Sequence, residues 1–366
     1  MSDGKQCRAA VAFERGGPLR IEEITVRDPG PGEVRIRVAA CGICASDLHV
    51  WRTGEGIEFP AVLGHEASGV VEAIGPGVRE VTEGQAVVLA WIPRCGVCRA
   101  CRAGRTHLCT SLRTNNNDGS LSLGGQPLGR YMSISGLSEY VVVGERSAIP
   151  IPEGLSLVSA CSVGCGVTTG FGAAVISGES RWGESVAVFG CGGVGLSAVQ
   201  GARIAGASRI IAVDPNPARL ELAGRLGATN CISPSDGDPV ATIHALSDGG
   251  VDLAIESVGK TAVVRQAFDA LASGGRAIAV GLMGYTEEVS IPVMSLIFDK
   301  SLRGSIHGSA DPVRDFPKIF DLAIRGDLQL EAMTGPDYSL DQVNEAFEAS
   351  LTGSAIRPRI VFDSFS

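Results

Sequence analysis

Between residues 8 and 150, apolar side chains occur in short β-branched runs that Gly and Pro interrupt. Examples of these runs are Val34–Ala39, Ala67–Ile74, Ala86–Leu89 and Glu139–Val143. Short runs bounded by turn-forming residues are typical of β-strands. The pattern predicts a strand-rich domain in this part of the chain, with the polar stretch Thr114–Ser122 as a surface loop.

From about Val167 onward, short apolar runs alternate with segments of helical periodicity. The predicted order is strand 185–189, helix 194–205, strand 209–213, helix 217–226, strand 251–256, helix 262–271 and strand 276–280. Strands that alternate with helices form βαβ units, whose crossovers are right-handed. The pattern therefore predicts an α/β fold with a doubly wound parallel sheet.

After about Ser309 the alternation stops. Helices are predicted near 313–324 and 340–351, followed by a last strand near 359–362. A chain of 366 residues is long enough for two domains with separate cores. We expect this tail to belong to the first domain.

Composition narrows the class of protein. Hydrophobic residues make up 45% and charged residues 19%, which is typical of globular chains rather than disordered ones. The formal charge is −9, from 31 basic and 40 acidic residues, so nucleic acid is not an expected partner. No run of 18 apolar residues and no N-terminal signal core occur, so we expect a cytoplasmic protein without a membrane partner.

Eleven cysteines is a high count, and an odd number in a chain without a secretion signal argues against a disulfide framework and favours metal binding. Cys95, Cys98, Cys101 and Cys109 follow the spacing C-x2-C-x2-C-x7-C. Four thiolates at this spacing can complete the tetrahedral shell of one zinc ion and leave no position for substrate. We expect a structural zinc site. Unrelated buried cysteines, an iron–sulfur cluster and a zinc-ribbon module are the alternatives.

A second, open metal site is predicted from residues that lie far apart in the sequence. Cys44 is followed about twenty residues later by His65, and Cys165 lies in a glycine-rich segment. Two thiolates and one imidazole would hold zinc and leave a fourth position for water or an alcohol. Zinc lowers the pKa of a bound oxygen strongly, to about 7 for water in the best-known case. When each of these side chains is taken singly, the alternative is that it is an ordinary residue of the hydrophobic core.

A glycine motif follows the predicted strand 185–189. It has the form G-x-G-x-x-G and comprises Gly190, Cys191, Gly192, Gly193, Val194 and Gly195. This motif between a strand and a helix is typical of dinucleotide binding, with the pyrophosphate at the helix N-terminus. Asp214 ends the next strand, where a carboxylate would bond the ribose hydroxyls and repel a 2′-phosphate, which favours NAD over NADP. The alternative for Asp214 is a turn residue at the end of the strand. Arg219, five residues later, is either a ribose contact or a solvated helix residue.

The order of these motifs resembles that of the zinc-dependent medium-chain alcohol dehydrogenases over nearly the whole chain. The similarity is greatest to the branch that includes glutathione-dependent formaldehyde dehydrogenases and dimeric alcohol dehydrogenases. The resemblance implies a GroES-like catalytic domain formed by residues 1–166 and 307–366, and a Rossmann domain formed by residues 167–306. It also implies two zinc ions per chain, NAD as cofactor and a homodimer.

The resemblance also implies roles for individual residues. Ser46 would bond the substrate hydroxyl, and His49 would end a proton relay that passes through the cofactor ribose. Glu66 would approach the catalytic zinc during ligand exchange, with a buried partner for a basic group as its alternative. Further cofactor contacts would be made by Thr169, Asp214, Arg219, Val280, Gly281, Leu282, Ser305, His307 and Arg357. The substrate pocket would be lined by Phe59, Trp91, Tyr131 and Met132, unless each is simply part of the core.

One position departs from the family pattern. Ala45 occupies a place where members of this branch commonly carry a basic residue that contacts the pyrophosphate. The expected function is reversible oxidation of a primary or secondary alcohol, bulky or aromatic, to an aldehyde or ketone. A dehydrogenase of S-hydroxymethyl thiol adducts is the alternative within the family, and a zinc-binding scaffold without catalysis is the alternative from another class.

Overall fold

The computed structural model describes residues 4–92, 94–113 and 118–363, and these form two compact units. The first unit contains the chain up to Cys165, Asp311–Gly326 and the chain from Leu330 onward. The second contains Gly166–Ala310 and Asp327–Gln329. Each unit is therefore assembled from segments that are not contiguous in sequence.

The units differ slightly from the expected domain ranges. Unit 2 extends to Ala310 rather than ending at 306, because a 3-10 turn at His307–Ser309 packs against helix α4 (Gly166–Val175). A Cβ at Gly172 of this helix would lie 2.4 Å from the carbonyl oxygen of Gly308. Only glycine permits this close approach, which ties the turn to unit 2.

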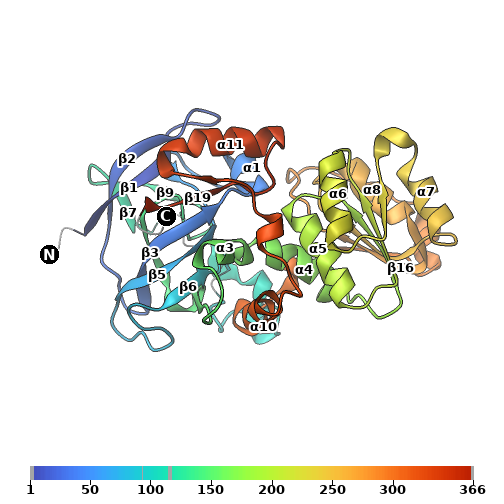
Figure 1. Ribbon diagram of the computed structural model, residues 1–366. Helices are drawn as coiled ribbons and strands as arrows, with labels where there is room; N and C mark the ends of the chain where they lie inside the picture. The colour runs from blue at the N-terminus through green and yellow to red at the C-terminus, as the bar shows by residue number, and fades with distance from the viewer. Residues whose placement is uncertain (1–3, 93, 114–117, 364–366) are drawn as a thin grey trace. The chain divides into compact units, whose positions relative to one another are not determined.

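Unit 1 is built around two β-sheets, as Figure 1 shows. The first sheet has the order β8-β7-β2-β1-β4-β9, and β10 pairs with β3 of the second sheet, whose order is β11-β6-β5-β3-β19-β18. The bounds in the first sheet are β1 Lys5–Ala12, β2 Arg20–Val26, β4 Ala61–Val62, β7 Leu121–Leu123, β8 Gln126–Pro127 and β9 Gly129–Arg130. Those in the second are β3 Glu33–Gly42, β5 Glu66–Ile74, β6 Ala86–Leu89, β10 Tyr140–Gly144, β11 Ala148–Pro150, β18 Asp337–Tyr338 and β19 Arg359–Val361.

The C-terminal segment completes unit 1. Strand β19 pairs antiparallel with the end of β3, and helix α11 (Val343–Thr352) contacts α1 (Ala45–Thr53). Figure 1 shows both C-terminal elements in red beside the blue N-terminal ones. The remaining helices of this unit are α2 (Arg99–Arg102), α3 (Leu157–Ala160) and α10 (Pro312–Ile324). Buried Val, Ile and Leu side chains from both sheets form its core.

An ion pair between a buried arginine and a partly exposed aspartate also holds unit 1 together. Arg130 Nη1 donates to Asp118 Oδ2 at 2.5 Å, and the arginine side chain is only 3% exposed. Nη2 donates to the carbonyl oxygens of Ser133 and Val142. Burial would raise the pKa of Asp118, but the charge of Arg130 and the hydrogen bonds from Ser120 outweigh burial and lower it. The carboxylate therefore stays ionised opposite the buried guanidinium.

Replacing Asp118 with asparagine is expected to destabilise unit 1 by about 3 kcal/mol at neutral pH, because a buried arginine loses its counter-charge. Since the folded pKa is depressed, this stabilisation is complete above the unfolded value of about 4 and is lost as pH falls through the folded value. Urea unfolding at neutral and acidic pH measures both effects. Asp341→Asn is the control, because the pair that Asp341 makes with Arg8 is exposed and is worth less than about 1 kcal/mol. An equal loss in both variants would contradict the prediction.

Unit 2 contains the parallel sheet that the sequence pattern predicts. Its order is β14-β13-β12-β15-β16-β17, and each pair of neighbouring strands is parallel. The strand bounds are β12 Ser185–Phe189, β13 Arg209–Val213, β14 Asn230–Ile232, β15 Val251–Glu256, β16 Leu271–Ala279 and β17 Ser301–Gly304. The helices besides α4 are α5 Gly193–Ile204, α6 Pro217–Leu226, α7 Pro239–Leu246, α8 Thr261–Asp269 and α9 Val293–Ile297.

Local sequence explains where these elements begin and end. Strands β12 and β13 are continuous apolar runs because helices cover both faces of a parallel sheet. Helix α6 begins at Pro217 after Asn216, whose side chain accepts hydrogen bonds from the amides of Ala218 and Arg219, and Gly227 ends it. Strand order reverses between β12 and β15, which is where ligands bind at the carboxyl edge of such sheets.

Part of the pattern was misinterpreted at the level of single elements. The expected surface loop Thr114–Ser122 includes residues 114–117, which lie outside the described residues, and its end enters strand β7, where Leu121 is buried. Helix α1 was not expected, because its nine residues lack a clear apolar stripe. Tertiary contacts, rather than local sequence, determine the secondary structure at both positions.

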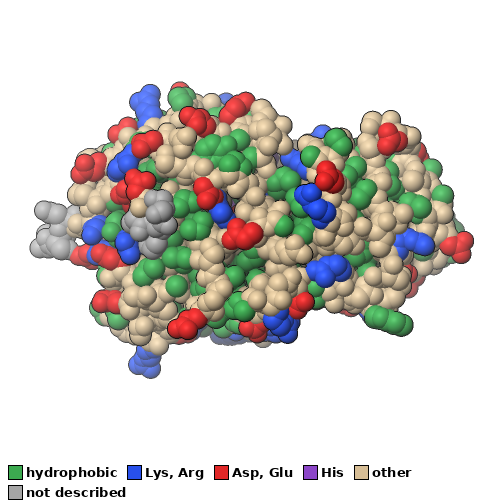
Figure 2. All heavy atoms as spheres, in the orientation of Figure 1, with side chains coloured by type: hydrophobic (Ala, Val, Ile, Leu, Met, Phe, Trp, Pro, Cys, Tyr) green, Lys and Arg blue, Asp and Glu red, His purple; other side chains and the backbone are tan. Residues whose placement is uncertain are grey.

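On the face drawn in Figure 2, acidic and basic side chains are interspersed over both units. In the described part of the chain, no single helix is long and apolar enough to cross a membrane, although the bent pair Leu157–Gly164 and Gly166–Val175 passes a test of length and composition.

Candidate metal centres and dinucleotide site

The residues predicted for the open metal site come together in unit 1. Cys44 precedes helix α1, His65 and Glu66 lie at the start of β5, and Cys165 follows a 3-10 turn at Cys161–Gly164. One ligand atom from each of these four side chains lies within 4.8 Å of the others. A hydrogen bond from Cys165 and the nearby His65 hold the pKa of the Cys44 thiol well below its usual value. Two sulfur atoms and an imidazole fit zinc by the chemistry of the donors.

Asp47 orients two of these ligands, and the sequence reasoning missed it. Its carboxylate is fully buried and accepts hydrogen bonds from the amides of Cys44 (3.0 Å) and Gly64 (2.9 Å). It also lies 3.3 Å from Nδ1 of His65. A carboxylate at Nδ1 fixes the histidine tautomer and leaves Nε2 for a metal. The available signal was an acidic residue three positions after Cys44, which forms a capping box at the start of α1.

The charge of Asp47 also affects the imidazole. Burial would lower the pKa of His65, but the nearby Asp47 charge and its hydrogen bond outweigh burial and raise the pKa well above its usual value. The ring is therefore strongly basic and electron-rich. A more basic imidazole is a better metal ligand, because the metal ion binds at the nitrogen that would otherwise hold a proton.

Glu66 has a basic partner within the same unit. Arg357 Nη2 forms an ion pair with Glu66 Oε1, and both side chains are buried. Gly42 makes room for this carboxylate, since a Cβ there would lie 2.6 Å from Glu66 Oε2. The resemblance implied a contact of Arg357 with the pyrophosphate; the structure gives Glu66 as its partner. The alternative for Glu66, a buried partner of a basic group, thus describes its contact.

Ser46 and His49 both lie on α1 but have different partners. Ser46 Oγ is 3.3 Å from His65 Nε2, which places the hydroxyl beside the predicted metal position. His49 Nε2 is 3.0 Å from Glu55 Oε2 instead. Both side chains remain partly accessible. The relay that joins them through a cofactor stays a prediction.

Two aromatic side chains surround the imidazole of His65. The ring centroids of Tyr131 and Trp91 lie 5.3 and 6.2 Å from it, and both contacts are edge-to-face. Tyr131 Oη donates a hydrogen bond to the Ser46 carbonyl oxygen at 3.1 Å. Phe59 and Met132 are partly buried and pack against the core of unit 1. Trp91 and Tyr131 are thus the two predicted pocket residues that the structure places against a metal ligand.

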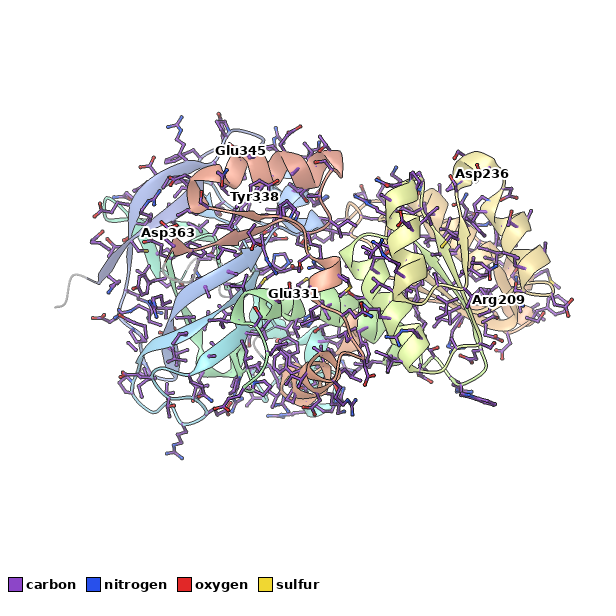
Figure 3. All side chains as sticks on the ribbon, viewed as in Figure 1. Arg209, Asp236, Glu331, Tyr338, Glu345 and Asp363 are labelled. Atoms are coloured by element: carbon purple, nitrogen blue, oxygen red, sulfur yellow. The ribbon has the colours of Figure 1, made fainter. Side chains whose placement is uncertain are left out.

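The segment that carries Cys165 is braced by the C-terminal tail. Ser159 Oγ donates to Glu331, which Figure 3 labels, and Arg359 Nη1 donates to Ser159 Oγ at 3.4 Å. Arg359 is held in turn by Asp337. These bonds fix helix α3 and the turn that leads into Cys165. The C-terminal tail therefore supports the segment that positions this thiol.

The four clustered cysteines also converge. Sulfur atoms of Cys95, Cys98, Cys101 and Cys109 lie within 4.8 Å of one another. The amide of Cys101 donates to Cys98 Sγ at 3.4 Å, and this hydrogen bond is the main reason that the pKa of Cys98 is lowered to about 5. The same kind of bond joins the amide of Cys98 to Cys95. Four sulfurs fit a closed zinc site that holds the lobe between β6 and β7.

The glycine motif of unit 2 forms the predicted turn between β12 and α5. A Cβ at Gly195 would lie 1.7 Å from the carbonyl oxygen of Gly190, whereas a Cβ at Gly192 would meet nothing within 4 Å. Gly195 is therefore required for packing, and Gly192 leaves its backbone open to a group that approaches closely. No described side chain caps the start of α5. This start fits a pyrophosphate.

The other predicted dinucleotide residues of unit 2 lie mostly after the carboxyl ends of its strands. Asp214 is buried after β13, and its carboxylate accepts hydrogen bonds from the amides of Cys191 (2.7 Å) and Asn216 (2.8 Å). Strand β16 is followed by Val280, Gly281 and Leu282, and β17 by Ser305 and His307; Thr169 lies on α4 and Arg219 on α6. Arg357 belongs to unit 1.

Comparison with known proteins supports these assignments at the level of the family. Residues 30–153 match the model of the alcohol dehydrogenase GroES-like domain, and residues 193–325 match that of the zinc-binding dehydrogenase. An S-(hydroxymethyl)glutathione dehydrogenase of Haemophilus influenzae is 41% identical over 96% of both chains. One of Escherichia coli is 40% identical over 96% of this chain and 98% of the relative.

Solved structures give the same result. An alcohol dehydrogenase zinc-binding domain protein from Burkholderia ambifaria matches with a TM-score of 0.94 and 38% identity, covering 98% of this chain and 99% of its own. A benzyl alcohol dehydrogenase from Acinetobacter calcoaceticus matches with a TM-score of 0.93 and 33% identity over the same shares. The predicted GroES-like and Rossmann architecture is confirmed. The chain belongs to the zinc-dependent medium-chain alcohol dehydrogenase family of oxidoreductases.

Proposed function

We propose that this protein oxidises a primary or secondary alcohol, bulky or aromatic, to an aldehyde or ketone and transfers the hydride to NAD. The observation that carries the proposal is the convergence of Cys44, His65 and Cys165, with Ser46 Oγ 3.3 Å from His65 Nε2. A side-chain hydroxyl beside an incomplete set of zinc ligands is suited to receive a substrate hydroxyl.

Two zinc ions per chain are proposed, with unlike roles. The closed set of four cysteines would maintain the fold, and the open set would supply Lewis-acid activation of a hydroxyl group. Ser46 would accept the proton of the substrate hydroxyl while its own hydroxyl proton passes through the cofactor ribose toward His49. His49 would pass a proton toward solvent, since it is partly exposed and bonded to Glu55. Asp47 would keep His65 oriented throughout.

The dinucleotide would be held by unit 2 and would supply the hydride acceptor. Gly192 would permit close approach of the pyrophosphate to the backbone, and Asp214 would bond the ribose hydroxyls. A 2′-phosphate placed against the buried Asp214 carboxylate would be repelled, so we propose NAD rather than NADP. Thr169, Val280, Gly281, Leu282, Ser305 and His307 would complete the dinucleotide contacts.

A bulky or aromatic alcohol is proposed because Trp91 and Tyr131 present large rings around His65. Similarity to a benzyl alcohol dehydrogenase supports this choice. The second candidate is an S-hydroxymethyl thiol adduct, because the relatives at 40–41% identity are named S-(hydroxymethyl)glutathione dehydrogenases. Both candidates share the same zinc ligands and the same chemistry at the hydroxyl-bearing carbon.

The decisive experiment is a substrate panel on the zinc-loaded protein, followed by NADH absorbance. The panel contains ethanol, 2-propanol, benzyl alcohol and a mixture of formaldehyde with glutathione, each with NAD and with NADP. Highest kcat/KM for benzyl alcohol supports the first candidate, and highest kcat/KM for the thiol mixture supports the second. Turnover of none of them would contradict both and favour a zinc-binding scaffold. Preference for NADP would contradict the role of Asp214.

Ala45→Arg is expected to tighten NADH binding about tenfold, because a charge-assisted hydrogen bond to the pyrophosphate is worth about 1.4 kcal/mol or more. Position 45 is exposed at the first turn of α1, so an arginine is accommodated there. NADH fluorescence titration measures the effect. Ala45→Gln serves as the control for side-chain size without charge. Equal affinities of the arginine variant and the parent protein would contradict the prediction.

A homodimer is also proposed, from the family resemblance and from an apolar surface segment of unit 2. Val293, Met294, Ile297 and Phe298 at helix α9 are each at least 60% exposed, next to edge strand β17. Burial of this segment against a second copy would remove it from water. Light scattering of the parent protein and of Phe298→Glu tests it: a dimer that the substitution dissociates supports the proposal, and a monomeric parent protein contradicts it.

A further inference from the structure

The chain has an unusual backbone directly after Tyr131. Met132, Ser133 and Ser135 have φ angles of 48°, 59° and 62°, although none is glycine. Side chains other than glycine rarely adopt this left-handed region, because the Cβ then lies too close to the backbone. The surrounding structure must therefore hold the segment in place. This matters because Tyr131 contacts both His65 and the Ser46 carbonyl oxygen.

Arg130 supplies much of that support. Nη2 of its guanidinium donates to the Ser133 carbonyl oxygen, inside the left-handed stretch, and to the Val142 carbonyl oxygen of β10 at 2.8 Å. Nη1 donates to Asp118 Oδ2 at 2.5 Å. A planar guanidinium can hold these acceptors at the same time, whereas a lysine ammonium cannot reproduce the fork. Arg130, at the end of β9, thus links the turn to β10 and to Asp118 in the chain before β7.

The other bonds are made within the turn or to strand β4. The Tyr131 amide bonds Val62 O at 3.3 Å and Ser135 Oγ at 3.2 Å, and the Ser135 amide returns to Tyr131 O at 3.2 Å. The Val62 bond ties Tyr131 to β4 and the other two close the turn on itself, but none of these bonds attaches Ser133 to the rest of unit 1. The guanidinium of Arg130 makes that attachment to β10. Its loss would free Ser133 from β10, while backbone bonds to Val62 and Gly64 would still hold the two ends of the turn.

We propose that the Arg130–Asp118 pair is a positioning device that fixes Tyr131 and thereby determines which alcohols fit beside Ser46 and His65. This inference rests on the proposed function, because it concerns the substrate space of that site. Among the described residues, Arg130 bonds Asp118, Ser133 and Val142 and none of the metal ligands, so it is a positioning residue rather than a catalytic one. Substitution of Arg130 should therefore change the preference for large over small alcohols and should leave zinc binding unchanged.

The test compares Arg130→Lys with a matched control in the zinc-loaded protein. Arg35→Lys is the control, because Arg35 is also largely buried and bonds two carboxylates, at 2.6 Å to Glu72 and 2.7 Å to Asp28. Its partners lie on β5 and in the chain before β3, and none belongs to the predicted site. Both variants lose a guanidinium fork, so any general cost to folding is shared. kcat and KM are measured for benzyl alcohol and ethanol.

In Arg130→Lys, KM for benzyl alcohol is expected to rise about tenfold and KM for ethanol to change less than about twofold, since small misplacements near reacting groups are costly. Arg35→Lys should leave the ratio of the two kcat/KM values unchanged. A uniform fall in kcat with an unchanged ratio would overturn the proposal, because that result reports a smaller active fraction. Zinc content and thermal midpoint are recorded for each variant.

A second arm does not depend on turnover. The near-ultraviolet circular dichroism of the zinc-loaded protein reports the packing of all its aromatic side chains, Tyr131 and Trp91 among them, and it should weaken in Arg130→Lys but not in Arg35→Lys. If Arg130→Lys does not fold, Asp118→Asn replaces it, because this substitution keeps the guanidinium and changes only the carboxylate that pairs with it. No turnover of any alcohol by the parent protein would contradict the proposed function alone. An unchanged dichroism band would overturn the positioning role.

Discussion

Cys165→Ser is expected to lower kcat/KM for alcohol oxidation at least about a thousandfold, because serine is a poor replacement for a thiolate ligand of zinc. The metal bound by Cys44, His65 and Cys165 is proposed to activate the substrate hydroxyl, and removing one ligand would empty or distort this site. Zinc analysis should find one ion per chain instead of two, since the cysteine cluster is separate. Kinetics and metal content are measured on the same preparation.

Cys161→Ser is the matched control for this substitution. Cys161 is also a buried cysteine, lies four residues before Cys165 and is not part of either metal-ligand group. This variant should retain two zinc ions and most of the activity. If Cys165→Ser kept both zinc ions and near-normal turnover, the open site would not be where the proposal places it. If both variants lost activity equally, a general defect in folding would explain the loss.

The second large effect is expected on stability. Cys101→Ser should release the structural zinc and destabilise unit 1 by on the order of 5 kcal/mol or more, since zinc binding to four-ligand sites contributes directly to folding. No residue of helix α2 is buried, so a zinc ion bound there would take the place of a hydrophobic core in this lobe. Urea unfolding, zinc analysis and protease cleavage between residues 95 and 109 measure the loss.

Cys231→Ser is the control for the cluster, because this cysteine is exposed and lies in unit 2. It should leave zinc content and unfolding unchanged. Normal stability of Cys101→Ser with two bound zinc ions would contradict a structural role. Iron in place of zinc, with visible absorbance, would favour the iron–sulfur alternative. Loss of the closed site is thus expected to lower stability, and loss of the open site is expected to lower turnover.

Much of unit 2 was predictable from the sequence, although α4, β14, α7, α9 and β17 were not predicted. The predicted strands 185–189, 209–213 and 251–256 coincide with β12, β13 and β15, and the predicted helix 217–226 coincides with α6. The reason is local: strands buried on both faces are continuous apolar runs, and caps such as Asn216 and Gly227 mark helix ends. The glycine motif was likewise readable, because backbone conformation requires glycine at Gly190 and packing requires it at Gly195.

Unit 1 was less predictable, because non-local contacts decide it. The hairpin of β1 and β2 and helix α1 were not expected, and β19 pairs with β3 from the far end of the chain. Metal-ligand candidates were still found, since cysteine and histidine are recognisable by residue type. Their partners were not, because a buried Asp or Arg is indistinguishable in sequence from a solvated one.

By itself, the sequence determined the chemistry that is available: the four-cysteine spacing, the glycine motif and the ligand types at Cys44, His65 and Cys165. Only the tertiary structure decided which charges these groups meet. It placed Asp47 on His65, Arg357 on Glu66 and Arg130 on Asp118. The physical reason is that thiol and imidazole side chains reveal metal chemistry by type, whereas a carboxylate acquires its role from burial and from the donors that surround it.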